Sequence, residues 1–270
     1  MRNFMILRTM PLLLPLLIIS ALSISVESRA QVSGAEGVPP VSVEQFTQVL
    51  WDQTANMTTF GSASQNFTDT GGVNDSFDNR SADDFNIPGP NGWNIETVRA
   101  IGFYQLGTSG PAQSLNVVFF ADDGGLPGNV VPGCQYNNIQ PTNISDPDFF
   151  INLPALCALL PGTYWLSVQA NMPFNPNGQW FWFTESVQTL NLFTWENPLN
   201  GFGSGCTTWK PGINCISDTG PDLTFQFIGE QFVVPRPIPT LSRWGLIAAA
   251  GALGLVSLIA VRGRAPRSGA

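Results

Sequence analysis

The chain contains no histidine, and this absence excludes several kinds of chemistry. Ser-His-Asp and Cys-His systems use an imidazole as general base, so neither can be built here. Zinc and iron sites with imidazole ligands are excluded for the same reason. The chain also lacks the Gly-x-x-x-x-Gly-Lys pattern that cradles nucleotide phosphates. Carboxylates are therefore the side chains left for catalysis.

Charge is scarce, and basic residues are the scarcer kind. Residues 31–237 hold eighteen of the nineteen acidic residues but only four basic ones, so this segment has a net charge near −14. A surface of that sign repels nucleic acid and anionic lipid. We therefore expect no nucleic-acid partner. The charge suits an extracellular protein that meets divalent cations.

The N-terminal residues 1–30 have the three parts of a secretory signal peptide. Arg2 and Arg8 precede an apolar stretch at 12–22, and residues 28–30 form a small-x-small cleavage site. We therefore expect the chain to pass the secretion translocon and to be cut by signal peptidase.

An uncharged apolar run at 244–261 lies near the other end of the chain. As a helix it would be about 27 Å long, close to the roughly 30 Å of a hydrocarbon core. Three arginines follow it, which by the positive-inside rule leaves the tail 262–270 in the cytoplasm and the preceding residues outside. A buried core helix is the alternative, but the length and the flanking arginines favour a transmembrane helix.

The run begins within a short motif, whose residues are Ile238, Pro239, Thr240, Leu241, Ser242, Arg243, Trp244 and Gly245. Motif, span and basic tail together resemble the IPTL-CTERM sorting signal, with Arg243 where that family usually has an acidic or neutral residue. The family is related to PEP-CTERM signals, which exosortase-type membrane proteases read in Gram-negative bacteria. The resemblance implies transient anchoring in the inner membrane with the body in the periplasm. Cleavage near the motif and release to the outer surface or the exterior would follow.

Four cysteines lie between the two ends, at positions 134, 157, 206 and 215. An even count in an exported protein predicts two disulfides. Three pairings are possible, and we favour sequence neighbours, Cys134–Cys157 and Cys206–Cys215. Each bond should stabilise the fold by about 3 kcal/mol on the chain-entropy model.

The body at 46–232 is expected to be one all-β domain, between a linker at 31–45 and a second linker at 233–243 that carries the motif. Short apolar stretches alternate with turn signals, and none shows helical periodicity over three turns. Strands are expected over 82–88, 93–104, 114–121, 149–153, 163–170, 179–184, 190–195 and 223–228. About nine or ten such strands predict a jelly-roll-like β-sandwich.

Three stretches of the body resemble an unnamed class of secreted bacterial domains. They are the Ala-Asp-Asp-Phe strand at 82–85, the Asp-x-Gly-Leu-Pro-Gly turn at 123–128, and Pro-Gly-Thr-Tyr-Trp-Leu-Ser at 161–167. The resemblance implies a secreted domain without an assigned activity.

Two acids beside aromatic residues, Glu185 and Glu196, are the best candidates for a catalytic pair. In a glycosidase, one would act as acid and the other as nucleophile or base. Solvent-facing strand positions are the simpler interpretation, so we expect no enzyme and no catalytic residue. A carboxylate-dependent glycosidase is the alternative.

The aromatic run at 179–183 places Trp180 and Trp182 on one face of a strand and the two phenylalanines on the other. One face must be core. With Trp195, the tryptophans could form a platform for the sugar rings of an extracellular polysaccharide. Packing on both faces is the alternative. The sequence thus predicts a structural or interaction module at the cell surface or in the extracellular matrix, with a carbohydrate-binding module as the second possibility.

Four aspartates are candidate calcium ligands: Asp122 and Asp123 in a Gly-rich turn, and Asp83 and Asp84 in a strand. Aspartate also favours turns without any ion, and the spacing does not match a twelve-residue calcium loop. We therefore expect no obligatory cofactor, with calcium as an option at these positions.

Overall fold

The structure is a computed structural model that describes residues 47–107, 110, 112–143, 146–216 and 220–234. The predicted signal peptide, the first linker, the sorting motif and the run at 244–261 lie outside these residues. Within the described ranges, no helix has the length and apolar character needed to cross a membrane.

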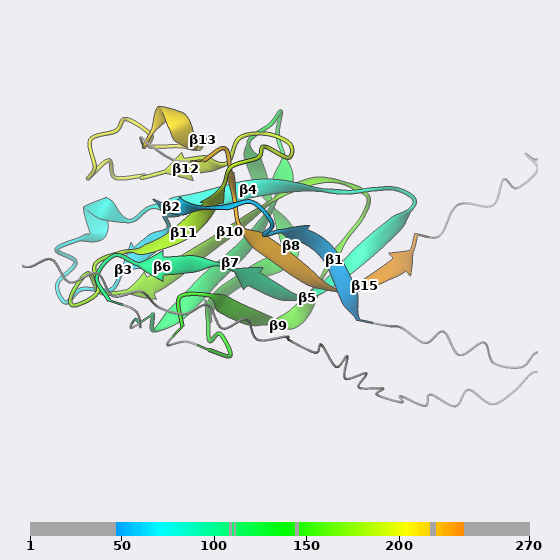
Figure 1. Cartoon of the computed structure of the whole chain (residues 1–270), viewed down its shortest axis with the longest axis horizontal. Helices are drawn as coiled ribbons and strands as arrows, with labels where there is room; N and C mark the ends of the chain where they lie inside the picture. Colours follow the sequence, from blue (N-terminus) through cyan, green and yellow to red (C-terminus); the bar gives the residue numbers. More distant parts are fainter. Residues whose placement is uncertain (1–46, 108–109, 111, 144–145, 217–219, 235–270) are drawn as a thin grey trace, which may run out of the picture. The chain divides into compact units, whose positions relative to one another are not determined.

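The described residues form β-strands with almost no helix, which confirms the all-β prediction (Figure 1). Two short 3-10 turns, η1 (Asp75–Phe77) and η2 (Gly212–Asn214), are the helical elements described. The strands are β1 (Gln48–Gln53), β2 (Met57–Ala63), β3 (Gln65–Phe67), β4 (Arg80–Ile87), β5 (Asn91–Ala100), β6 (Gly102–Tyr104), β7 (Ser114–Asp122), β8 (Pro127–Ile139), β9 (Phe149–Leu159), β10 (Gly162–Met172), β11 (Trp180–Glu185), β12 (Thr194–Glu196), β13 (Lys210–Pro211), β14 (Asp222–Leu223) and β15 (Phe225–Val233).

The strands are divided among three sheets. Sheet 1 has the order β1-β15-β5-β9, and sheet 2 has the order β13-β12-β4-β10-β7-β8. Sheet 3 has the order β14-β11-β2, with β6 also paired to β11. The named strands pair antiparallel except for β3, which lies parallel to β10 at the margin of sheet 2. This arrangement agrees with a β-sandwich and has one more sheet than the two expected of a jelly roll.

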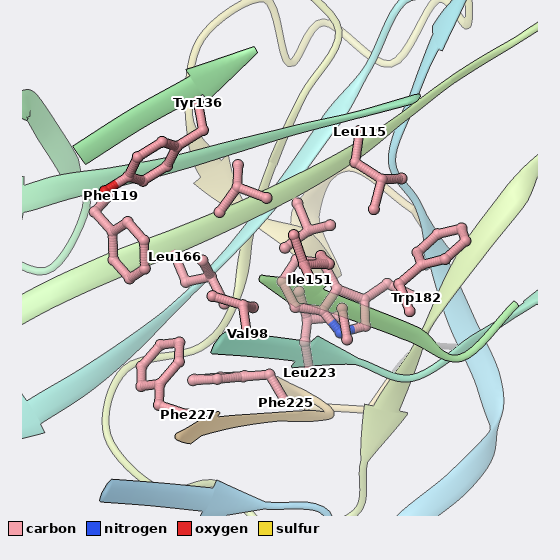
Figure 2. Close-up of a cluster of buried hydrophobic side chains, with 14 of the residues drawn as sticks. Val98, Leu115, Phe119, Tyr136, Ile151, Leu166, Trp182, Leu223, Phe225 and Phe227 are labelled. Carbon is pink, nitrogen blue, oxygen red and sulfur yellow. The ribbon is translucent and has the colours of Figure 1, made fainter. Parts of the chain in front are cut away.

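The hydrophobic core lies between sheets 1 and 2, and sheet 3 contributes to it. Figure 2 shows side chains of all three sheets converging, with Phe227 of β15, Phe119 of β7 and Trp182 of β11 among them. The ring centroids of Phe119 and Phe227 are 5.7 Å apart, and those of Phe85 and Phe227 are 4.7 Å apart. Such aromatic contacts across the two sheets stabilise the sandwich beyond simple area burial.

Both disulfides join the cysteines that were predicted to pair, which are neighbours in sequence. Cys134 of β8 is bonded to Cys157 of β9, so this bond connects sheet 2 to sheet 1 within the core. Cys206 and Cys215 close the loop that follows β12. Trp209 in that loop contacts Phe120 edge-on, with the ring centroids 5.7 Å apart. The loop therefore covers part of the outer face of sheet 2.

Candidate functional site

The three tryptophans expected to stack on sugars are core residues. Trp180 and Trp182 are fully buried and Trp195 is 1% exposed. Each indole N–H donates to a main-chain carbonyl: Trp182 to Thr224 at 2.6 Å and Trp195 to Ala63 at 3.0 Å, while Trp180 is bonded likewise to Pro147. Their faces are packed and their polar edges are satisfied. The hypothesis that these three tryptophans form a platform for sugar rings is therefore wrong.

The opposite face of sheet 3 carries a cluster of three phenylalanines, here called the phenylalanine face: Phe103 of β6, and Phe181 and Phe183 of β11. All three side chains are half-buried. The Phe103 ring of β6 stacks on Phe181 with centroids 5.3 Å apart and lies 4.7 Å from Phe183. Gly61 of β2 makes room for it, because a Cβ there would lie 2.8 Å from the Phe103 ring. The described surface therefore presents flat rings on the side that the tryptophans do not occupy.

Glu185 and Glu196 do not share a site. Glu196 lies on β12 of sheet 2 and forms an ion pair with Arg80, whose guanidinium also covers the Trp209 ring at 5.2 Å. Glu185 lies on β11 of sheet 3, directly across the strand pair from Asp222. The two acids thus have different partners on different sheets, unlike the acid pair of a glycosidase.

The four aspartates proposed for calcium mostly act as hydrogen-bond acceptors. Asp83 accepts from the Gln53 amide at 2.8 Å and from the Leu223 N–H at 2.7 Å. Asp84 accepts from the side-chain amide of Asn191 at 2.6 Å, and Asp122 accepts from the Trp165 indole at 2.9 Å. Asp123 is exposed in the turn after β7.

These bonds tie strands and loops together, and the four carboxylates do not converge on one point. Within the described part of the chain, no group of three or more Asp, Glu or Cys side chains has the arrangement of a metal centre.

A second feature of the site is a group of buried acids where sheets 1, 2 and 3 meet: Asp83, Asp84, Glu185 and Asp222. Each is at most 2% exposed. Burial raises the pKa of Asp83 well above its ordinary value, with a further contribution from the Asp222 charge. Burial likewise raises the pKa of Asp84 and of Asp222 to about 6, and raises the pKa of Glu185. These four carboxyl groups therefore keep their protons to a higher pH than exposed carboxyl groups do.

Sequence reasoning identified some of these residues and missed others. Asp83, Asp84 and Glu185 were recognised as candidate acids, whereas Asp222 and Gln53 were not, although both meet them in space. Asp222 reaches Glu185 through the pairing of β14 with β11, and Gln53 reaches Asp83 across thirty residues of chain. Both contacts depend on strand pairing, and no local motif indicates them.

Comparison with solved structures finds distant similarity. No protein-family model and no curated protein matches the chain. Among solved structures, the chain is similar to the cysteine protease and lectin-like domains of Cwp84, a surface layer associated protein of Clostridium difficile, at 12% identity and a TM-score of 0.38. The similarity covers 56% of this chain and only 32% of that one.

Proposed function

We propose that this chain is an exported protein of the Gram-negative cell envelope whose body is a non-enzymatic interaction module. The body would bind neutral extracellular polysaccharide through the phenylalanine face. Delivery would follow the route implied by the ends of the chain: export, transient anchoring in the inner membrane, and cleavage by an exosortase-type protease near residues 238–245.

The observation that carries the binding proposal is the stack of Phe103, Phe181 and Phe183 on the outer face of sheet 3. Half-buried rings held flat by their neighbours lose little side-chain entropy when a sugar ring stacks on them. The net charge near −14 of residues 31–237 opposes binding of nucleic acid and anionic lipid. A neutral sugar face has no such penalty.

We propose that the body is not an enzyme, because its two candidate catalytic acids are not placed together. Glu196 is paired with Arg80. Glu185 lies across the β11–β14 pair from Asp222 and lines a pocket of about 160 Å³. Ligand pockets of enzymes are usually about 300 Å³ or larger, so this space is small for a sugar together with attacking water. The placement thus favours a binding surface over a catalytic cleft.

Affinity of this kind should be weak. A stacked ring contributes about 1 kcal/mol, so three rings contribute about 3 kcal/mol and predict a dissociation constant in the millimolar range. Several copies on one polymer would be needed for tight retention.

A glycan array probed with the purified chain tests the proposal, together with a Phe181→Ala variant and a Leu199→Ala control. Leu199 is 67% exposed in the loop after β12 and makes no ring contact, so its loss should leave glycan binding unchanged. We expect binding to a neutral glycan, and we expect the affinity to fall about fivefold in Phe181→Ala, which corresponds to the loss of one stacking contact. No binding to any glycan, or equal binding by the two variants, would refute the sugar-binding role.

A further inference from the structure

An exposed glutamine, Gln105, lies at one end of the phenylalanine face. The pairing of β6 with β11 continues past the end of β6, because the Gln105 N–H donates to the Gln179 carbonyl at 2.8 Å. Side chains alternate between the two faces of a strand, so Gln105 falls on the same face as Phe103. The burial agrees, because Tyr104 is buried, whereas Phe103 is half-buried and Gln105 is exposed. The phenylalanine face therefore has a polar amide at this end.

The oxygen of the Gln105 side chain faces the chain that runs opposite it. Gln105 Oε1 accepts from the Gln179 N–H at 3.4 Å. A Cβ placed on Gly178 would lie 2.6 Å from the same oxygen. Gly178 has a φ of +73°, a conformation that glycine adopts without strain. The glycine therefore leaves open the space that the Gln105 amide occupies.

The nitrogen of the same amide has its donors to spare. A glutamine amide carries two N–H donors on Nε2, and no residue in the described part of the chain accepts from Gln105 Nε2. The side chain is exposed, so a ligand can reach this nitrogen. A ligand on the phenylalanine face would therefore meet hydrogen-bond donors at the Gln105 end, and an acceptor on the ligand would be favoured there.

The rings next to Gln105 are apolar throughout. Phenylalanine lacks the N–H of tryptophan and the O–H of tyrosine, so the three rings offer a ligand no hydrogen bond. Strand β6 and residues 180–184 of β11 carry no charged side chain. This surface therefore suits an uncharged ligand that carries a small apolar group close to a hydrogen-bond acceptor.

We infer that the phenylalanine face selects acetamido sugars, with Gln105 Nε2 donating to the acetamido carbonyl and the acetamido methyl group in contact with the rings. An acetamido group is neutral and joins a carbonyl acceptor to a methyl group. A hydroxyl group supplies an acceptor but no methyl group, and a carboxylate adds a charge that the net charge near −14 of residues 31–237 opposes. The inference rests on the proposed function, because it names the class of sugar that the same face binds.

Two neutral oligosaccharides of equal length test this selection, a cello-oligosaccharide and a chito-oligosaccharide. They share the same backbone and linkage and differ in one substituent of each sugar, a hydroxyl group in the first and an acetamido group in the second. NMR titration of the purified chain measures affinities in the millimolar range. We expect the chito-oligosaccharide to bind about fivefold more tightly, the gain from one added hydrogen bond.

Gln105→Glu is the main variant, because it keeps the size of the side chain and the oxygen that accepts from the Gln179 N–H but removes both N–H donors. Gln135→Glu is the matched control, since Gln135 is exposed on β8 of sheet 2 and the same charge is added away from the phenylalanine face. We expect Gln105→Glu to bind the two oligosaccharides equally and Gln135→Glu to keep the fivefold preference. Thermal melts of both variants check that the fold is retained.

The titrations separate failure of this inference from failure of the proposed function. Equal binding of the two oligosaccharides by the unaltered chain, or a preference that persists in Gln105→Glu, overturns the selection of acetamido sugars and leaves sugar binding standing. Binding of neither oligosaccharide also overturns the selection, and the glycan array then decides on sugar binding independently.

Discussion

At the scale of single residues, neighbouring positions on β11 have opposite environments. Trp182 is fully buried and bonded through its indole, while Phe181 and Phe183 are half-buried on the other side. The alternation follows from the period-two geometry of a strand. It places the tryptophans in the core and the phenylalanines on a partly exposed face.

This separation predicts unequal effects of two substitutions at adjacent positions. Trp182→Ala should lower the free energy of unfolding by about 3 to 5 kcal/mol, because it leaves a large cavity and removes the indole hydrogen bond to the Thr224 carbonyl. Phe181→Ala should cost about 1 kcal/mol, because the ring is only partly removed from water. Urea denaturation of both variants gives the comparison, and equal losses would contradict the assignment of the two faces.

The sequence predicted the alternation on this strand, yet it could not say which face is core. Trp180 and Trp182 on one side and Phe181 and Phe183 on the other are all large and apolar, so hydrophobicity does not distinguish them. The choice depends on Phe225 and Phe149, which pack on the tryptophan side from sheet 1. Those contacts are far apart in sequence and become visible only in the folded chain.

At the scale of elements, most strands with strong local signals were predicted and those with weak signals were not. The run at 114–121 is β7, paired on both sides as expected of a central strand. The stretch at 93–104, for which one longer strand or a bent pair was expected, forms the two strands β5 and β6. Strand β8 was missed, because its few apolar residues do not alternate regularly and two prolines and two glycines interrupt them. The strand expected at 190–195 is reduced to β12, since its first residues form a loop.

The β8–β9 disulfide should matter more to stability than the loop disulfide. Replacing Cys134 and Cys157 by serine should lower the free energy of unfolding by about 3.4 kcal/mol, and replacing Cys206 and Cys215 by about 2.6 kcal/mol, because the longer loop gains more entropy when unfolded. The sequence separations are 23 and 9 residues. Chemical denaturation of the two double variants measures both values, and a larger loss from the shorter loop would contradict the entropic explanation.

At the scale of the whole molecule, the charge is strongly negative and part of it is buried. Residues 31–237 carry eighteen acidic side chains against four basic ones, and Asp83, Asp84, Glu185 and Asp222 lie inside the domain. Composition alone predicted the negative balance. It could not predict the burial, because Asp222 and Glu185 are brought together only by the pairing of β14 with β11.

The buried acids predict that stability falls as pH rises. Asp84 and Asp222 have a pKa of about 6 in the fold, against an ordinary value of 3.8, so the folded state holds more protons between these values. Stability contributed by the protonated forms is therefore present below about pH 4 and is lost as pH rises through about 6. After allowance for solvent screening, the loss should be about 2 to 3 kcal/mol.

Thermal melts without divalent ions, at about pH 4.5 and about pH 7.5, check this dependence. We expect the lower Tm at the higher pH and a smaller difference in Asp222→Asn. A Tm that rises with pH over this range would contradict the environment assigned to the acids.

The most direct measurement of the central claim is fractionation of producing cells with two antibodies, one to residues 47–234 and one to the tail 262–270. The account predicts that the body is found at the outer surface or in the medium, separated from the tail, which stays with the inner membrane. Body and tail found together in the cytosol would contradict it.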